Sequence, residues 1–194
     1  MAEPGLTVPG AIQPDRADPD VLRLFFALWP DDATRDALDD TGQRLHQQWR
    51  GRRMRADTLH LTLAFLGATP VTQLQALISR VEAIQARAFT LVLDQPGYWH
   101  HNRVGWLGPT RSPDQLGELV SMLNGAIVEA GVNFDPRPHR PHVTLVRDAV
   151  GGALPPCGGV RWEVRDFVLV ASCLGADGPC YDLLGRWPLN SQAG

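Results

Sequence analysis

Two short segments of this sequence share the pattern His-x-Thr-Leu, and each one follows a strand pattern and a helix pattern. The segments are HLTL, which begins at His60, and HVTL, which begins at His142. In the first half of the chain 35 residues separate Phe25 from His60, and in the second half 38 residues separate Val104 from His142. Near-equal spacing within a repeat predicts two similar lobes that face each other across a cleft.

Hydrophobic periodicity and turn residues predict a mixed order of strands and helices, which indicates an α+β fold. The predicted strands are 21–29, 58–67, 89–93, 103–109, 142–147, 160–173 and 180–189, and the predicted helices are 33–49, 70–86 and 113–130. Residues 95–102 are predicted to form a loop.

The length of 194 residues suits one domain, or two small halves that share a core. Residues 1–20 contain four prolines and are expected to form a flexible tail, so that 21–194 form a single bilobal domain. The N-terminus lacks the features of a signal peptide, and no apolar run is long enough to cross a bilayer. We therefore expect a cytoplasmic protein that does not contact membranes.

The charge balance limits the contacts that the protein can make with nucleic acid. The formal net charge is −3, and all 18 basic residues are arginine. A surface that follows many phosphates usually carries a basic excess, so any contact with nucleic acid should be small and local. The absence of lysine excludes a lysine nucleophile, a Schiff base and a P-loop lysine.

The three cysteines, Cys157, Cys173 and Cys180, match no zinc or redox motif, and their number is odd. We therefore expect no disulfide framework and a reducing compartment. Neither motif includes an acidic residue, and the residue two places after each motif histidine is a threonine. Metal binding is accordingly not expected.

Alternation along a strand places residues i and i+2 on the same face. His60 and Thr62 should therefore share one face of their strand, as should His142 and Thr144. If the lobes pack symmetrically, both pairs meet at one site.

Two histidines at one site suit proton transfer, because one can take a proton while the other gives one. Threonine hydroxyls can donate hydrogen bonds to an oxygen that becomes negatively charged, and an arginine can bind phosphate. Arg147, five residues after His142, is the natural candidate for that arginine. Together these groups indicate phosphodiester chemistry without a metal.

A single His-x-Thr on a half-exposed strand is usually structural, whereas two copies at matched places in a repeat favour a functional role. A structural role for both motifs, and a binding module without catalysis, remain alternatives. Among the other histidines, His46, His100 and His101 suit the surface, and His139 suits either the cleft or a structural role. Side chains that could contact a nucleotide at the rim are Trp29, Phe65, Tyr98, Trp99, Arg50, Arg52, Arg53, Arg55, Arg137 and Arg140.

The motif segments resemble those of the 2H phosphoesterase superfamily, and in particular the RNA 2′,3′-cyclic phosphodiesterases, also called 2′-5′ RNA ligases, of bacteria and archaea. The similarity extends from about Arg23 to Leu189. Its segments are RLFFALWP, HLTLAFLG, VGWLG, RPHVTLVR and GRWPL. The resemblance implies a bilobal, pseudo-twofold α+β fold in which two antiparallel sheets line a central groove and the helices lie outside.

The resemblance also implies an activity, which is hydrolysis of RNA 2′,3′-cyclic phosphate ends to 2′-phosphomonoesters without a cofactor. His60 would be the general acid and His142 the general base. Thr62 and Thr144 would bind the non-bridging oxygens, and Arg147 would support the phosphate. The expected partners are RNA ends or small nucleotides that carry a 2′,3′-cyclic phosphate, bound by a monomer. Ligation of RNA halves through a 2′-5′ bond is the reverse reaction and an alternative activity.

Overall fold

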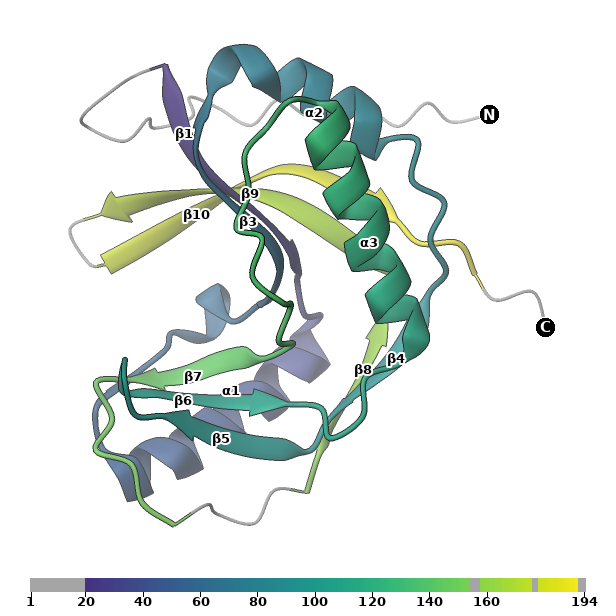
Figure 1. The fold of residues 1–194 in the computed structure, drawn as a ribbon. Helices are drawn as coiled ribbons and strands as arrows, with labels where there is room; N and C mark the ends of the chain where they lie inside the picture. The colour runs from purple at the N-terminus through teal and green to yellow at the C-terminus, as the bar shows by residue number, and fades with distance from the viewer. Residues whose placement is uncertain (1–19, 154–157, 176–177, 192–194) are drawn as a thin grey trace.

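The structure is a computed structural model that describes residues 20–153, 158–175 and 178–191, and its fold is α+β (Figure 1). The expected tail therefore lies almost wholly outside the described residues. The helices are α1 (Asp32–Trp49), α2 (Leu74–Val81) and α3 (Asp114–Glu129), with 3₁₀ turns at Ala56–Thr58 and Val71–Gln73. The strands are β1 (Val21–Leu28), β2 (Arg52–Arg53), β3 (Leu61–Pro70), β4 (Phe89–Leu93), β5 (Gln95–Trp99), β6 (Val104–Gly108), β7 (Val143–Arg147), β8 (Val160–Val164), β9 (Asp166–Gly175) and β10 (Gly178–Pro188).

The main sheet consists of two antiparallel halves that meet at one point. Its strand order is β10-β9-β1-β3-β7-β6-β5, with β2 paired to β7. Strands β3 and β7 share only the register pair Leu61 and Val143, whereas β1 and β3 share eight pairs. We call β10, β9, β1 and β3 the first half-sheet, and β7, β6, β5 and β2 the second half-sheet. Figure 1 shows them diverging, the first above and the second below.

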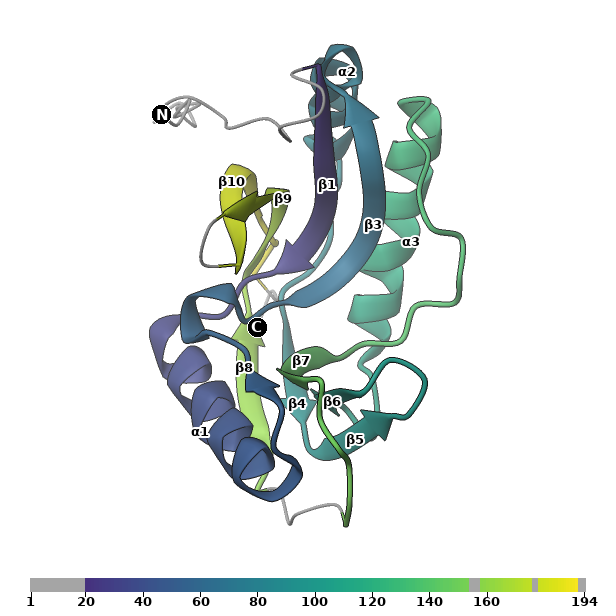
Figure 2. The same ribbon diagram turned by 90° about the vertical axis from the view of Figure 1, so that its left-hand side faces the viewer.

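The helices lie outside the two half-sheets, on opposite sides of the molecule (Figure 2). Helix α1 packs against β7 and β8, and α3 packs against β3 and α2. The Asp31 side chain caps α1 by accepting a hydrogen bond of 2.8 Å from the Thr34 amide. Leu38, Leu45 and Trp49 of α1 are fully buried, as their helical spacing predicts.

Residues 95–99 form strand β5, so the prediction of a loop there is wrong. The strand lies at the edge of the main sheet, where the missing amide hydrogen of Pro96 costs no interior hydrogen bond. Gly97 leaves room for the Trp106 ring, which lies where a β-carbon would stand. Proline and glycine usually indicate a loop. Here the edge position tolerates the proline, and the close packing of the Trp106 ring suits the glycine.

Other predicted elements differ from the structure in their boundaries. The strand predicted over 58–67 begins only at Leu61, after a 3₁₀ turn, and continues to Pro70. The predicted strand 160–173 is divided at Arg165 into β8, which pairs with β4 in a separate two-stranded sheet, and β9, which joins the main sheet. The helix predicted over 70–86 begins as a 3₁₀ turn, and its α-helical part ends at Val81.

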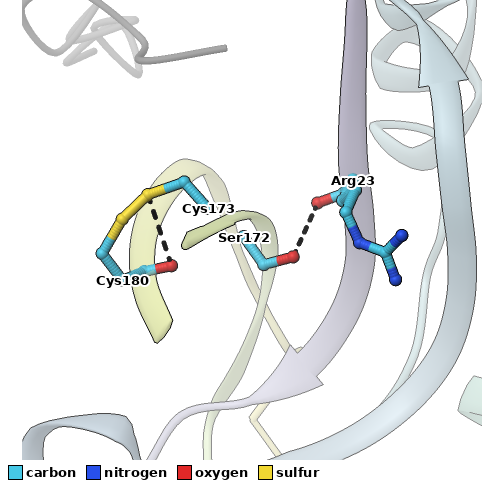
Figure 3. The surroundings of a disulfide bond; sticks show 4 residues. All are labelled: Arg23, Ser172, Cys173 and Cys180. Atoms are coloured by element: carbon cyan, nitrogen blue, oxygen red, sulfur yellow. Dashed lines mark hydrogen bonds between the residues drawn. A yellow bond between two sulfur atoms is a disulfide. The ribbon is translucent and has the colours of Figure 1, made fainter. Parts of the chain in front are cut away.

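A disulfide joins Cys173 of β9 to Cys180 of β10, contrary to the expectation from the cysteine count (Figure 3). The two residues are register partners in the β9–β10 hairpin, which brings their side chains together across the ladder. The next pair along the hairpin is Ser172 with Tyr181, and the Ser172 hydroxyl donates to the carbonyl oxygen of Arg23 at 3.3 Å. The third cysteine, Cys157, lies outside the described residues.

No helix in the described ranges combines the length and the apolar character that a membrane span requires.

Candidate active site

A cavity of about 240 Å³ lies between the two half-sheets and takes residues from both of them. All five residues that the sequence analysis singled out for the site line this cavity. The complete lining is Phe25, Met54, Thr58, His60, Thr62, Phe65, His142, Thr144, Arg147, Ser172 and Tyr181. The convergence of the two His-x-Thr pairs that the repeat predicts is therefore confirmed as a matter of geometry.

The two motifs hold equivalent places in the two half-sheets. His60 immediately precedes β3, and His142 immediately precedes β7. In each motif the second and fourth residues are buried in the core, while the histidine and the threonine line the cavity. Alternation along a strand produces this division, because each apolar side chain that enters the core sends its neighbours to the other face.

A backbone carbonyl two residues earlier in the chain orients each imidazole. Nδ1 of His60 donates to the carbonyl oxygen of Thr58 at 2.7 Å, and Nδ1 of His142 donates to that of Arg140 at 2.7 Å. A carbonyl oxygen can only accept, so the proton of each neutral ring is on Nδ1. Nε2 of each ring therefore keeps its lone pair and can take a proton, or return one.

Aromatic rings enclose His60 on several sides. The Trp29 ring is stacked on the imidazole with the ring planes 6° apart and the centroids 5.6 Å apart. The Phe25 centroid lies 4.9 Å away, and Tyr181 approaches edge-on with a centroid distance of 5.3 Å. His60 thus has little contact with water beyond the opening of the cavity.

His142 has fewer aromatic neighbours. The Trp99 ring meets it edge-on with a centroid distance of 4.5 Å, and Trp106 lies at 6.4 Å. Both rings belong to the β5–β6 hairpin of the second half-sheet. Each histidine is therefore held by aromatic residues of its own half-sheet and its flanking segments.

Burial lowers the pKa of both histidines. The pKa of His60 falls to about 4, and the charges of His142 and Arg147 contribute to this after burial, while the hydrogen bond to Thr58 acts in the opposite direction. The pKa of His142 is lowered mainly by burial and further by the charges of His139 and Arg147. Without a bound anion both imidazoles are therefore neutral at pH 7.

Arg147 supplies a positive charge to the cavity without a carboxylate partner among the described ion pairs. Three of the arginines considered for the rim are instead paired with acidic side chains: Arg53 with Asp39, Arg55 with Asp57 and Arg137 with Asp135. None of the six rim arginines lines the cavity. Among the arginines that the structure describes, Arg147 is thus the one that lines the cavity and can meet an anion there.

Three of the four aromatic candidates for the rim lie at the site, and one does not. Trp29 and Trp99 contact the histidines, and Phe65 lines the cavity with 40% of its surface exposed. Tyr98 is not at the site, because it packs against Trp49 and its hydroxyl donates to the carbonyl oxygen of Ala149 at 2.8 Å.

Sequence reasoning missed several lining residues, above all Tyr181 and Phe25. Both lie on strands that were predicted, but alternation alone does not say which face of a strand meets a cleft. His46, His100 and His101 do not line the cavity. Among the described residues, no three His, Cys, Asp or Glu side chains are grouped to hold a metal ion.

Comparison with known proteins assigns the chain to a family. Residues 28–106 match the model of the LigT-like phosphoesterases. An RNA 2′,3′-cyclic phosphodiesterase of Escherichia coli is 37% identical over 169 residues, which cover 86% of this chain and 96% of that protein. The chain belongs to the LigT-like phosphoesterase family.

Solved structures of this family have the same fold. The crystal structure of E. coli LigT in its apo form superposes with a TM-score of 0.81 at 36% identity, covering 88% of this chain and 99% of that one. E. coli LigT complexed with 3′-AMP gives a TM-score of 0.80 at 36% identity, covering 87% and 98%. The 2H phosphoesterase fold that the motifs implied is therefore confirmed.

Proposed function

We propose that this LigT-like phosphoesterase hydrolyses 2′,3′-cyclic phosphate ends of RNA to 2′-phosphomonoesters. The observation that carries the proposal is the meeting of two His–Thr pairs and Arg147 in one cavity. Two properties of relatives support it: the E. coli relative is named for this activity, and LigT of E. coli binds 3′-AMP.

The proposed reaction needs one proton acceptor and one proton donor on opposite sides of the phosphorus. Nε2 of His142 takes a proton from water as the water oxygen bonds to phosphorus. Nε2 of His60 gives a proton to the 3′ oxygen as the bond between phosphorus and that oxygen breaks. The product keeps its phosphate on the 2′ oxygen, and each proton transfer contributes about 10²–10⁴-fold to the rate.

The environment of His60 makes its role as the acid depend on the substrate. Its pKa of about 4 leaves the imidazole neutral at pH 7 before substrate binds. A phosphodiester anion in the cavity favours the charged imidazolium and so raises the pKa of His60. The general acid is thus protonated together with substrate binding, while His142 has to remain neutral to accept the proton of the water.

The remaining polar groups of the cavity suit the phosphate. The hydroxyls of Thr62 and Thr144 can donate to the two non-bridging oxygens, one from each half-sheet. The Arg147 guanidinium can add a charge-assisted hydrogen bond, which is about twice as strong as a neutral one. A single local cation of this kind agrees with a chain whose net charge is −3.

Product analysis tests the proposed function. The purified protein is incubated with a short RNA that ends in a 2′,3′-cyclic phosphate, with and without a chelator and with and without a second RNA that carries a 5′-hydroxyl. We expect a 2′-phosphate under all conditions. A 3′-phosphate, no turnover, loss of activity with the chelator, or a joined RNA as the main product would contradict the proposal.

We also propose that the protein acts as a monomer in the cytoplasm. Its cavity is completed by residues of one chain, which supports a monomer. Light scattering at the concentration used for kinetics tests this state.

Disulfides are uncommon in the cytosol, so the redox state of Cys173 and Cys180 tests the proposed compartment. Rapid alkylation of thiols in intact cells should find both cysteines reduced if the protein is cytoplasmic.

A further inference from the structure

The two half-sites stand on strands that are barely joined by the backbone. Leu61 with Val143 is the only register pair between β3 and β7. If that register continued, Leu63 would face Pro141, which has no amide hydrogen to donate. The ladder between the two motifs therefore ends one step after it begins, and some other contact has to fix the two strands relative to each other.

A third histidine crosses the gap that the ladder leaves. Nε2 of His139 donates to the carbonyl oxygen of Thr62 at 2.9 Å, in the middle of the first motif. The chain leading to His139 follows β3 as well, since the Asp135 amide donates to the carbonyl oxygen of Phe65 at 2.9 Å. The side chain of His139 thus takes the place of a backbone donor on the exposed edge of β3.

His139 is also adjacent in sequence to the residue whose carbonyl orients the imidazole of His142. Arg140, the next residue, provides the carbonyl oxygen that holds Nδ1 of His142 at 2.7 Å. His139 is partly buried, and in the segment that leads to it an ion pair joins Asp135 to Arg137. Displacement of His139 would therefore move the carbonyl of Arg140 relative to Thr62.

We propose that His139 is a positioning residue that sets the separation of the two half-sites by linking the Thr62 carbonyl to the segment that orients His142. It touches neither the reacting atoms nor the phosphate. It acts through Thr62 in the first motif and through the Arg140 carbonyl in the second. This inference rests on the proposed function only in so far as its kinetic test needs a substrate.

The kinetic test uses His139→Phe, which keeps a ring and removes the donor, and His139→Gln, which restores an N–H donor. His100→Phe, at an exposed histidine outside the cavity, is the matched control. With a nucleoside 2′,3′-cyclic phosphate we expect His139→Phe to lower kcat about tenfold or more with KM within about twofold, because small displacements of reacting groups are costly. We expect His139→Gln to recover kcat to within about threefold of the parent.

Parent-like kcat in His139→Phe would overturn the proposal. So would equal losses of kcat in the Phe and Gln variants, because that result would indicate packing rather than the hydrogen bond.

A second measurement does not need turnover, so it separates this inference from the proposed function. Nitrogen-15 NMR of the imidazoles should find His139 protonated on Nε2 and His142 protonated on Nδ1 in the parent protein. His139→Phe, which removes the donor, should shift the imidazole signals of His142 more than the control variant His100→Phe shifts them. A neutral His139 protonated on Nδ1 would overturn the positioning role, even if His139→Phe does not fold. Failure of the protein to hydrolyse any cyclic phosphate would overturn the function alone.

Discussion

The first and second motifs have the same four-residue pattern and the same backbone orientation of the histidine, but their surroundings differ. Three aromatic rings surround His60, one of them stacked on its face, while two edge-on or more distant rings approach His142. Burial lowers the pKa of both rings, to about 4 for the more enclosed His60. Two equal motifs therefore give two chemically unequal imidazoles.

The reaction proposed for this site needs His60 charged and His142 neutral, so the bound phosphodiester anion has to raise the lowered pKa of His60. A symmetric pair would compete for one proton, and their apparent pKa values would belong to the pair. In the proposed mechanism the enclosed His60 becomes charged when an anion binds beside it, and His142 accepts the proton of the water. The predictions that follow examine the two half-sites separately.

Removal of either imidazole should have the largest effect. We expect His60→Ala and His142→Ala each to lower kcat for a nucleoside 2′,3′-cyclic phosphate by about 10²–10⁴-fold, because each deletes one proton transfer. Steady-state kinetics on folded protein measures the loss. His101→Ala, at an exposed histidine outside the cavity, serves as the control, and full activity in either site variant would exclude that residue from catalysis.

A substrate with a better leaving group should separate the two roles. A 3′-thio analogue of the cyclic phosphate expels a thiolate, which needs little protonation. We expect His60→Ala to recover about 10²-fold in rate on this analogue relative to the normal substrate, because that variant lacks only the acid. His142→Ala should not recover. The opposite pattern would reverse the assignment of acid and base.

The disulfide distinguishes the two half-sheets in stability. It lies in the first half-sheet, one ladder step from Tyr181 and Ser172 in the cavity wall. Because it closes a short loop of the unfolded chain, replacement of Cys173 and Cys180 by serine should lower the free energy of unfolding by about 2 kcal/mol. Urea denaturation with and without reductant measures this effect. Reductant should lower the stability of the parent to that of the double variant and leave the variant unchanged.

Acidification should destabilise the folded protein mainly through His60. Its pKa is about 4 when folded and 6.5 when unfolded, so the unfolded chain binds more protons between these values. The contribution of His60 is present above pH 6.5 and is lost as the pH falls to about 4, by about 3 kcal/mol. Chemical denaturation across this range should show a smaller loss for His60→Asn than for the parent. If His142→Asn reduced the acid-induced loss of stability by as much as His60→Asn does, or by more, the expected difference between the two sites would be contradicted.

Periodicity was sufficient for the parts of the fold that depend on local pattern. Helix α1 begins one residue before its predicted start, and the threonine-bearing faces of β3 and β7 meet as the repeat requires. The strand at Pro96 and Gly97 was missed because an edge position and the packing of Trp106 override the usual meaning of these residues.

Other features depend on contacts between distant parts of the chain, which a pattern in one segment does not contain. The bond between Cys173 and Cys180 follows from the register of the hairpin rather than from a cysteine motif. The ring of Tyr181 reaches His60 across 121 residues of sequence. The hydrogen bond from His139 to Thr62 likewise joins residues that lie 77 positions apart in the sequence.

The way each imidazole is held has a consequence for how such a site could originate. The acceptors of the two Nδ1 protons are main-chain oxygens at Thr58 and Arg140, each two residues before its histidine. Every amino acid at those two places supplies the same oxygen, so the orientation is a property of the local turn and does not require a chosen side chain. A segment of this kind orients its own imidazole, so doubling one ancestral half would supply a second, already oriented imidazole in a single genetic event.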